Sequence, residues 1–214
     1  MVPVPCSPPS SPRTAGFSEA GAYILQLEAS DGDLSDSDTV AITVNAAGLA
    51  PFAEEGGTVV MEAENFDTND TRSDATGWWL ESTDYAGYVG DGHMEAPGSG
   101  TETWADAAEL TYEIDFSTAG TYYIWVRRWA DKKQENTAFV GLDGTQIGGI
   151  FDDEQANYDQ WYWKEHSTTV YISAAQHTFN LRRREPQYGV DRIILTDDSG
   201  YTPSGNGPAE SPRQ

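Results

Sequence analysis

Residues 121–129 read TYYIWVRRW, and residues 137–144 read TAFVGLDG. The first stretch is apolar on both faces, which is typical of a strand that has something packed on each side. The second stretch ends in Asp143-Gly144, a pair that favours a tight turn. These two stretches therefore predict antiparallel strands that lie deep inside a β-structure.

The same pattern of short strand-like runs and turn residues continues in both directions. Gly, Asp, Asn and Ser separate the runs, and no segment keeps a helical period for three turns. The further runs are residues 58–64, 108–116, 167–174, 177–184 and 190–196. Several strands at this spacing predict an all-β fold, an antiparallel β-sandwich or jelly roll, over residues 58–198.

Four other segments flank this predicted sandwich. Residues 1–15 are rich in Pro and Ser, which predicts a disordered tail. Residues 16–47 contain two strand-like runs on either side of the acidic stretch SDGDLSDSD, which predicts a β-hairpin. Residues 48–57 and 199–214 are predicted to be linkers.

Composition excludes several function classes. The 214 residues include 12 Lys+Arg and 35 Asp+Glu, a net charge of −23, which argues against binding DNA or RNA. No window approaches the roughly 20 apolar residues of a membrane-spanning helix. The 7 Trp, 11 Tyr and 7 Phe argue against a wholly disordered chain. The N-terminus lacks a basic and an apolar signal-peptide region, so we expect a piece of a longer protein.

Strand direction predicts where the connections meet. Because antiparallel strands alternate in direction, every second connection lies at the same end of a sandwich. Residues 130–136, 151–160 and 184–188 should therefore share one end, opposite the tight turn at Asp143-Gly144. Binding sites concentrate in such long connections on a rigid scaffold, so we expect the functional site there.

The residues expected at this end suit a sugar. Seven of the 12 basic residues lie in 127–133 and 182–184, and Trp and Tyr residues lie between them. Aromatic faces stack on the apolar C–H face of a sugar, and charged groups bond its hydroxyls. Because positive charge gathers here, an acidic sugar is a hypothesis beside neutral ones. The alternative interpretation is that the aromatics form core and the charges form a solvated rim.

Five stretches carry a resemblance to a known family. They are VVMEAENFD, RRWADKKQENTAFVGLDG, the Trp161–Trp163 pair, AAQHTFNLRRRE and GVDRIILTDD. Over residues 58–198 the chain resembles carbohydrate-binding modules of the family 6 and family 35 type, the galactose-binding-like β-jelly roll. Residues 16–47 resemble the last strands of a bacterial immunoglobulin-like or cadherin-like repeat.

The resemblance implies a function and a setting. It implies non-catalytic binding to a polysaccharide of the plant or algal cell-wall type, as an accessory domain of a glycoside hydrolase or a similar enzyme. It also implies a bacterial protein that is secreted or held at the cell surface as part of a larger multidomain chain. We expect a monomer that binds neither nucleic acid nor membrane.

The resemblance further implies a structural calcium ion (Ca2+). Its ligands would be Glu62, Glu64 and Asp191, since the family holds the ion with an E-A-E strand and an Asp that opens the last strand. Residues i and i+2 of a strand point the same way, so both glutamates could reach one cation. Without the resemblance, they read as surface carboxylates on an edge strand.

The predicted sugar site combines the resemblance with the loop arrangement. Its residues are Trp161, Tyr188, Tyr85, Trp129, Asn136, Arg128, Arg184 and Glu185. In the family two aromatics sandwich a sugar. Trp161 or Trp163 matches one of them, and Tyr85, Tyr88 or Tyr188 could supply the other. The family has an Asn two residues before the Asp of the last strand, and Gly189 replaces it here. Hydrogen bonds to the sugar hydroxyls are therefore expected from Arg184, Glu185 and Asn136.

Two alternatives compete with a binding module. A jelly-roll polysaccharide lyase or glycosidase is the enzyme alternative, but the Gln-x-His strand typical of the lyases is absent, as are a G-x-S-x-G elbow and a phosphate loop. Three His and one Cys offer little for zinc. The second alternative is a calcium-stiffened cell-surface or adhesion spacer without a sugar site. Polysaccharide binding separates these readings, and we predict that the chain is not an enzyme.

Overall fold

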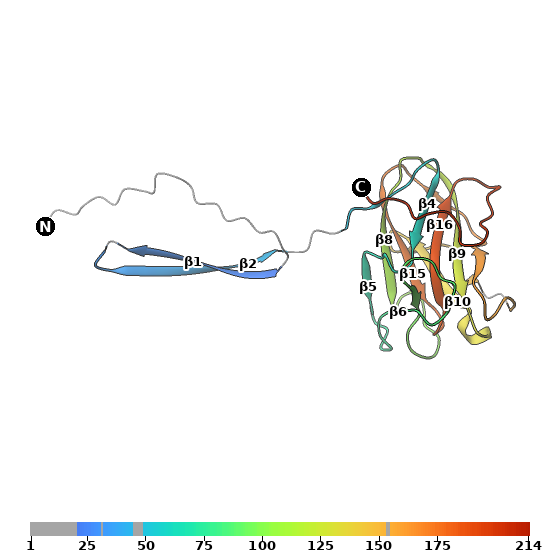
Figure 1. Cartoon of the computed structure of the whole chain (residues 1–214), viewed down its shortest axis with the longest axis horizontal. Helices are drawn as coiled ribbons and strands as arrows, with labels where there is room; N and C mark the ends of the chain where they lie inside the picture. Colours follow the sequence, from blue (N-terminus) through green and yellow to red (C-terminus); the bar gives the residue numbers. More distant parts are fainter. Residues whose placement is uncertain (1–20, 31, 45–48, 153–154) are drawn as a thin grey trace. The chain divides into compact units, whose positions relative to one another are not determined.

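The computed structural model describes residues 21–30, 32–44, 49–152 and 155–214, and the chain divides into two units, residues 1–48 and 49–214 (Figure 1). In the first unit, β1 (Gly21–Ser30) pairs antiparallel with β2 (Ser35–Val44), as the hairpin prediction requires. The predicted tail, residues 1–15, lies outside the described residues. Within the described part of the chain, no helix is long and apolar enough to span a bilayer.

The second unit is built from two seven-stranded sheets, here called sheet I and sheet II. Sheet I has the order β11 (Thr145–Gln146), β10 (Thr137–Leu142), β15 (Gln176–Arg183), β8 (Glu109–Asp115), β3 (Phe52–Ala53), with β12 (Phe151–Asp152) beside β10 and β5 (Thr68–Asp70) beside β8. Sheet II has the order β13 (Tyr162–Glu165), β9 (Gly120–Trp129), β16 (Gly189–Thr196), β7 (His93–Glu95), β6 (Leu80–Ser82), with β14 (Val170–Ile172) beside β9 and β4 (Thr58–Glu62) beside β16.

The strand pairs are antiparallel except for β3 with β8, which is parallel. One short 3-10 helix, η1 (Lys133–Glu135), lies between β9 and β10. The two sheets bury a single large apolar cluster, as an antiparallel β-sandwich does. The all-β jelly-roll prediction is therefore confirmed.

Strand β9 shows why its sequence is apolar on both faces. Tyr122, Ile124 and Val126 belong to the core cluster between the sheets. Trp125 points to the outer face of sheet II and joins a second apolar cluster with Val60, Trp163 and Ile194, against which Tyr201 packs. Each face of β9 thus has its own apolar partners, in agreement with the prediction.

The C-terminal segment, residues 199–214, is part of the folded unit, in contrast to the predicted linker. The Ser211 N–H donates to the Val60 carbonyl at 2.9 Å, and the Val60 N–H donates to the Ser211 hydroxyl at 3.0 Å. The Trp163 indole N–H donates to the Gly205 carbonyl at 3.0 Å. Pro and Gly suit a linker, but here the segment covers the edge of β4, whose backbone groups would otherwise lack partners.

The folded unit also begins earlier than the predicted boundary at Thr58. Phe52 and Ala53, placed in the predicted linker 48–57, form β3 and are buried. The carboxylate of Glu54 accepts hydrogen bonds from the Ser117 hydroxyl and the Thr118 N–H, both at 2.8 Å. A two-residue strand has no alternation for a sequence pattern to reveal.

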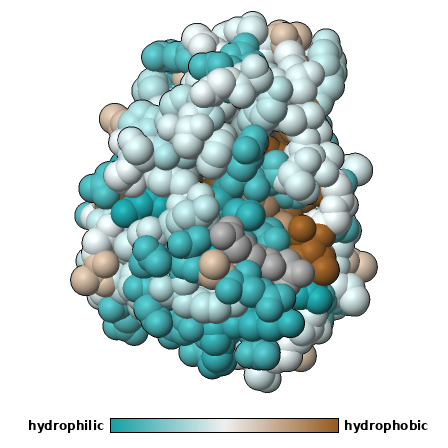
Figure 2. All heavy atoms as spheres, turned by 90° about the vertical axis from the view of Figure 1, so that its right-hand side faces the viewer, coloured by the Kyte–Doolittle hydropathy of each residue, from teal (hydrophilic) through white to brown (hydrophobic). Residues whose placement is uncertain are grey.

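The long connections meet at one end of the sandwich, as predicted. Trp129 at the end of β9 pairs with Gly189 at the start of β16, which pairs with Glu95 at the end of β7. In sheet I, Glu185 donates its N–H to the Thr137 carbonyl just after β15 ends, at the start of β10. Most of the face in Figure 2 is hydrophilic, with one small hydrophobic patch, in keeping with the net charge of −23.

Candidate functional site

Three aromatic residues gather at this end of sheet II, and we call them the aromatic platform: Tyr85, Trp129 and Trp161. The Tyr85 and Trp129 rings are stacked, with centroids 4.8 Å apart and 6° between their planes. Trp161 meets both rings edge-on, at 6.5 Å from Tyr85 and 5.6 Å from Trp129. All three side chains are partly exposed, so they offer a surface to a ligand.

Gly189 makes the platform possible. A side chain at this position would place its Cβ 3.1 Å from the Trp129 Cβ and 3.4 Å from the Tyr85 Cδ2. The glycine therefore lets Tyr85 lie over β16 beside Trp129. An asparagine side chain at this position would crowd both rings.

His93 lies beneath the platform and is fully buried. Its ring stacks on Tyr85 at 5.1 Å and meets Trp161 edge-on at 5.2 Å. Neither ring nitrogen has a hydrogen-bond partner among the described residues. Burial lowers the pKa of His93 to about 4, although the nearby charge of Asp84 opposes this. His93 is thus a neutral support for the platform at pH 7.

The electrostatic surroundings of the platform are acidic. Burial raises the pKa of the Tyr85 hydroxyl, and four carboxylates raise it further. These carboxylates belong to Glu95, Asp131, Glu135 and Asp84. Burial and its three acidic neighbours also raise the pKa of Glu95. The Trp129 indole N–H donates to Asp131 at 2.5 Å.

The basic residues predicted to face a ligand are instead paired with carboxylates. Six of the seven make such pairs: Arg127 with Asp191, Arg128 with Asp152, Lys132 with Glu135, Arg182 with Glu109, Arg183 with Asp74 and Arg184 with Glu185. In five of the six pairs the acid side chain is buried, and a charge removed from water needs a partner. The prediction that free positive charge gathers at this end of the sandwich is therefore wrong for the surface around the platform.

Several predicted site residues are buried. Tyr188 is fully buried in the core, and its hydroxyl donates to Asp152 at 3.5 Å. Arg128 is also fully buried, with its Nε 2.6 Å from the same carboxylate. Asn136 is fully buried as well. None of these three side chains can stack on or bond a ligand in this structure.

Arg184 and Glu185 are partly exposed but bond to each other and to β10. Arg184 donates to the Thr137 hydroxyl at 2.8 Å and to Glu185 at 3.2 Å. Glu185 also accepts the Asn136 N–H at 3.0 Å. These residues close the end of sheet I, whereas the aromatic platform stands on sheet II.

A groove of about 490 Å³ begins at Trp161 and lies on the outer face of sheet II. We call it the C-terminal groove. One wall consists of side chains from β9 and the β13 region: Trp125, Arg127, Trp161, Tyr162 and Trp163. The other wall is residues 202–206 of the C-terminal segment. The groove went unpredicted because that segment reads as a linker.

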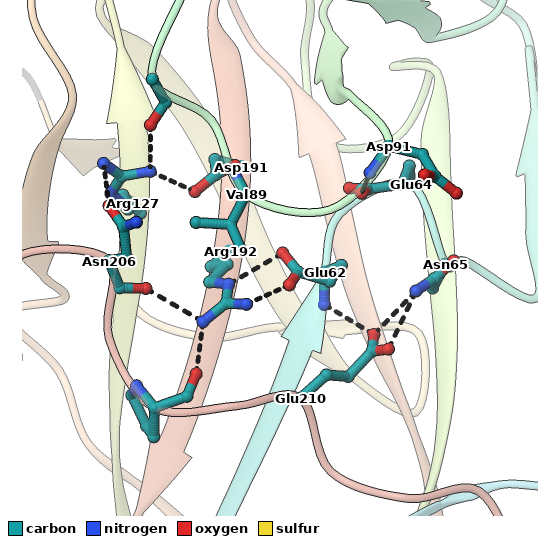
Figure 3. A network of polar contacts seen from close by, with 12 residues as sticks. Glu62, Glu64, Asn65, Val89, Asp91, Arg127, Asp191, Arg192, Asn206 and Glu210 are labelled. Atoms are coloured by element: carbon teal, nitrogen blue, oxygen red, sulfur yellow. Dashed lines mark hydrogen bonds and ion pairs between the residues drawn. The ribbon is translucent and has the colours of Figure 1, made fainter.

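The expected calcium ligands do not fit a calcium site as they are arranged. Both carboxylate oxygens of Glu62 accept hydrogen bonds from Arg192, one of them from Nε at 2.8 Å (Figure 3). Asp191 accepts the Val89 N–H at 2.7 Å and pairs with Arg127 at 2.5 Å. No group of three or more His, Cys, Asp or Glu side chains is placed to hold a metal ion within the described ranges.

Glu64 differs from its two predicted co-ligands. One carboxylate oxygen accepts the Asp91 N–H at 3.2 Å, and the other is buried without a hydrogen-bond partner among the described residues. Burial, together with the charge of Glu62, raises the pKa of Glu64 to about 7. One such carboxylate is too few for calcium, which takes six to eight oxygens.

The fold defines a class: a β-jelly-roll domain of the type seen in family 6 and family 35 carbohydrate-binding modules. A solved family 35 module from an environmental isolate is 19% identical, with a TM-score of 0.50 over 68% of this chain and 97% of that one. A family 35 module from Paenibacillus barcinonensis is 19% identical, with a TM-score of 0.49 over 65% and 99%. Residues 51–210 match the glycosyl hydrolase family 115 C-terminal domain, and the chain belongs to that family.

A curated relative is also similar in sequence. "Uncharacterized protein P23" from Formosa agariphila is 26% identical, and the match covers 73% of this chain. The chain spans 48% of the length of that relative.

Proposed function

We propose that the second unit is a non-catalytic carbohydrate-binding module that holds an attached polysaccharide-active enzyme on its substrate. The observation that carries this proposal is the position of Trp161, which belongs both to the aromatic platform and to the C-terminal groove. An indole face stacks on the apolar C–H face of a sugar. Tyr162, Ser204 and Asn206 along the groove offer neutral polar groups to the hydroxyls.

The favoured ligand is a neutral polysaccharide of the plant or algal cell-wall type. The four carboxylates around Tyr85 would repel a uronic acid, since like charges close together are unfavourable. The arginine of the groove, Arg127, is already paired with Asp191. A neutral sugar avoids both problems and still gains the stacking contact.

The family supports the proposed setting. The family is described as the C-terminal domain of a glycosyl hydrolase family, which supports an attached enzyme. The solved relatives described above are carbohydrate-binding modules, which supports binding without catalysis. A module for cell-wall polysaccharides works outside the cell, so the whole protein is proposed to be secreted or held at the bacterial surface, with this domain monomeric.

One or two stacking contacts predict weak monovalent binding. We expect dissociation constants from micromolar to millimolar, or about 4–8 kcal/mol of binding free energy. Such affinity suits a module that must release and rebind along a polymer while its enzyme works.

Affinity electrophoresis against neutral xylans, β-glucans and galactans, with polygalacturonate as the anionic polymer, tests this function. We expect at least one neutral polysaccharide to retard the protein and polygalacturonate to leave it unretarded. If no glycan retards it, the spacer alternative replaces the binding module. Release of reducing ends or of unsaturated products in the same mixtures would instead establish the enzyme alternative.

A further inference from the structure

Two arginines occupy the place where the resemblance implies a cation. The strand register puts Glu62 of β4, Arg192 of β16, Arg127 of β9 and Trp163 of β13 in one row across sheet II. Residues paired directly across neighbouring strands share a face, so the two guanidinium groups lie side by side. Two like charges in this position would repel each other if no anions lay between them.

A β-bulge supplies the second anion. The register between β16 and β9 shifts between Val190 and Arg192, which leaves Asp191 outside the regular pairing. A bulge changes the direction of a side chain that regular alternation would send to the other face. The Asp191 carboxylate consequently reaches Arg127, while Glu62 binds Arg192, so two cations and two anions balance (Figure 3).

The same guanidinium groups hold the C-terminal segment. Arg192 donates to the Asn206 carbonyl at 3.0 Å and to the Pro208 carbonyl. Arg127 donates to the Asn206 side-chain oxygen at 3.2 Å. Asn206 therefore accepts from both arginines, one through its backbone and one through its side chain (Figure 3).

Glu210 fixes the next part of the segment to β4. Its carboxylate accepts the Glu62 N–H at 2.9 Å and the Asn65 side-chain amide at 2.9 and 3.0 Å. Residues 202–206, just before these attachments, are the second wall of the C-terminal groove. The ion network and the wall of the groove are thus one connected structure.

We propose that Arg127 and Arg192 take the place of calcium in this domain, and that their network positions residues 202–206 as the wall of the groove. To bind Glu62 and Asp191, a divalent cation would have to displace the guanidinium groups of Arg192 and Arg127 from these carboxylates. It would then lie close to two positive charges. Folding and the shape of the groove are therefore independent of calcium. The role of the wall in sugar binding rests on the proposed function, whereas the network itself does not.

The first test is thermal unfolding of the wild-type chain in EDTA and in millimolar calcium chloride. We expect melting temperatures that agree within about 1 °C, because an ion that does not bind the native state adds no stability. Titration with terbium, read by emission sensitised from nearby Trp and Tyr, should show no saturable site. A melting temperature that rises with calcium, or a saturable terbium signal, would overturn the proposal.

The second test is hydrogen exchange in Arg192→Lys, because lysine keeps the charge and loses the fork that reaches Glu62 and two carbonyls. We expect about tenfold faster exchange over residues 203–210, with β8 and β15 unchanged. Asn206→Ala, at an exposed side chain, should give a smaller increase in the same segment. Arg72→Lys is the matched control, since its ion pair with Glu109 lies on sheet I.

Unchanged exchange over residues 203–210 in both Arg192→Lys and Asn206→Ala would show that the network does not position the segment. Neither the melting nor the exchange test involves a glycan. Failure of the proposed sugar binding would therefore leave both results intact, and the reverse also holds.

Discussion

The ring of Tyr85 lies parallel to the ring of Trp129, with their centroids 4.8 Å apart. One face of each ring is therefore covered by the other ring, and the two cannot hold a sugar between them. Trp161 meets both edge-on and lines the C-terminal groove. The geometry favours stacking of a sugar on Trp161 over the sandwich of two aromatics that the resemblance implies.

Replacing Trp161 with alanine should abolish retention by any polysaccharide that retards the wild type. The melting temperature should fall by only a few degrees, since the side chain is partly exposed and its N–H makes one hydrogen bond, to the Tyr85 carbonyl. Affinity electrophoresis and thermal unfolding measure the two effects. Tyr171→Ala is the matched control, because Tyr171 is 70% exposed on β14, away from the platform. Retention that survives in Trp161→Ala would remove this residue from the site.

Stability should fall as the pH drops from 6.5 towards 4, through His93. The pKa of His93 is about 4 in the folded state and near 6.5 in the unfolded chain, so the unfolded state binds the proton first. The difference corresponds to about 3 kcal/mol across this range. The groups that face His93 are Asp84, Tyr85, Tyr88 and Trp161, of which only Asp84 is charged here.

Urea unfolding at several pH values checks this, with His93→Phe as the comparison. Phenylalanine keeps the ring contacts and cannot take up a proton, so the variant should lose less stability between pH 6.5 and 4. Parallel pH profiles for the two proteins would show that His93 does not control this acid sensitivity.

Truncation after Asp198 should destabilise the domain by about 3 kcal/mol or more, because it uncovers the outer apolar cluster of Val60, Trp125, Trp163 and Ile194. Trp fluorescence should shift to longer wavelength as the indoles meet water. Ser211→Ala removes only the hydroxyl that accepts the Val60 N–H and should cost about 1 kcal/mol. Equal stability of the truncated and full chains would restore the linker interpretation.

Asp74→Asn should cost about 3 kcal/mol or more, because it leaves the buried guanidinium of Arg183 without its main partner. A second change, Arg183→Met, should recover part of this loss in a double-mutant cycle. Burial by itself raises the pKa of Asp74, but Arg183 and Thr76 more than offset this and hold it at about 2. The contribution of ionised Asp74 to the free energy of unfolding is therefore complete above about pH 4. It is lost as the pH falls through about 2. Additive losses in the double mutant would contradict the pairing.

The strand pattern was readable because it is local. The predicted runs at 121–129, 137–144, 177–184 and 190–196 correspond to β9, β10, β15 and β16. Alternation and turn residues carry this information within a few positions. The strands that went unpredicted, such as β3 and β11, are two residues long and have no period to detect.

The site was only partly predictable. Trp129, Trp161 and Tyr85 were expected together, and the structure brings them together. Tyr188 was grouped with them because it lies in a loop-end segment, yet it points into the core. His93 is not among the expected site residues, because its role depends on rings contributed by other segments.

The sequence by itself determined the all-β fold and the end of the sandwich where the long connections meet, since both follow from short-range periodicity and strand direction. The tertiary structure alone decided how the charges are used. Arg192 meets Glu62 across 130 positions, and Arg183 meets Asp74 across 109. No local pattern encodes such pairs, because they arise only when distant strands pack and a buried charge must find its opposite.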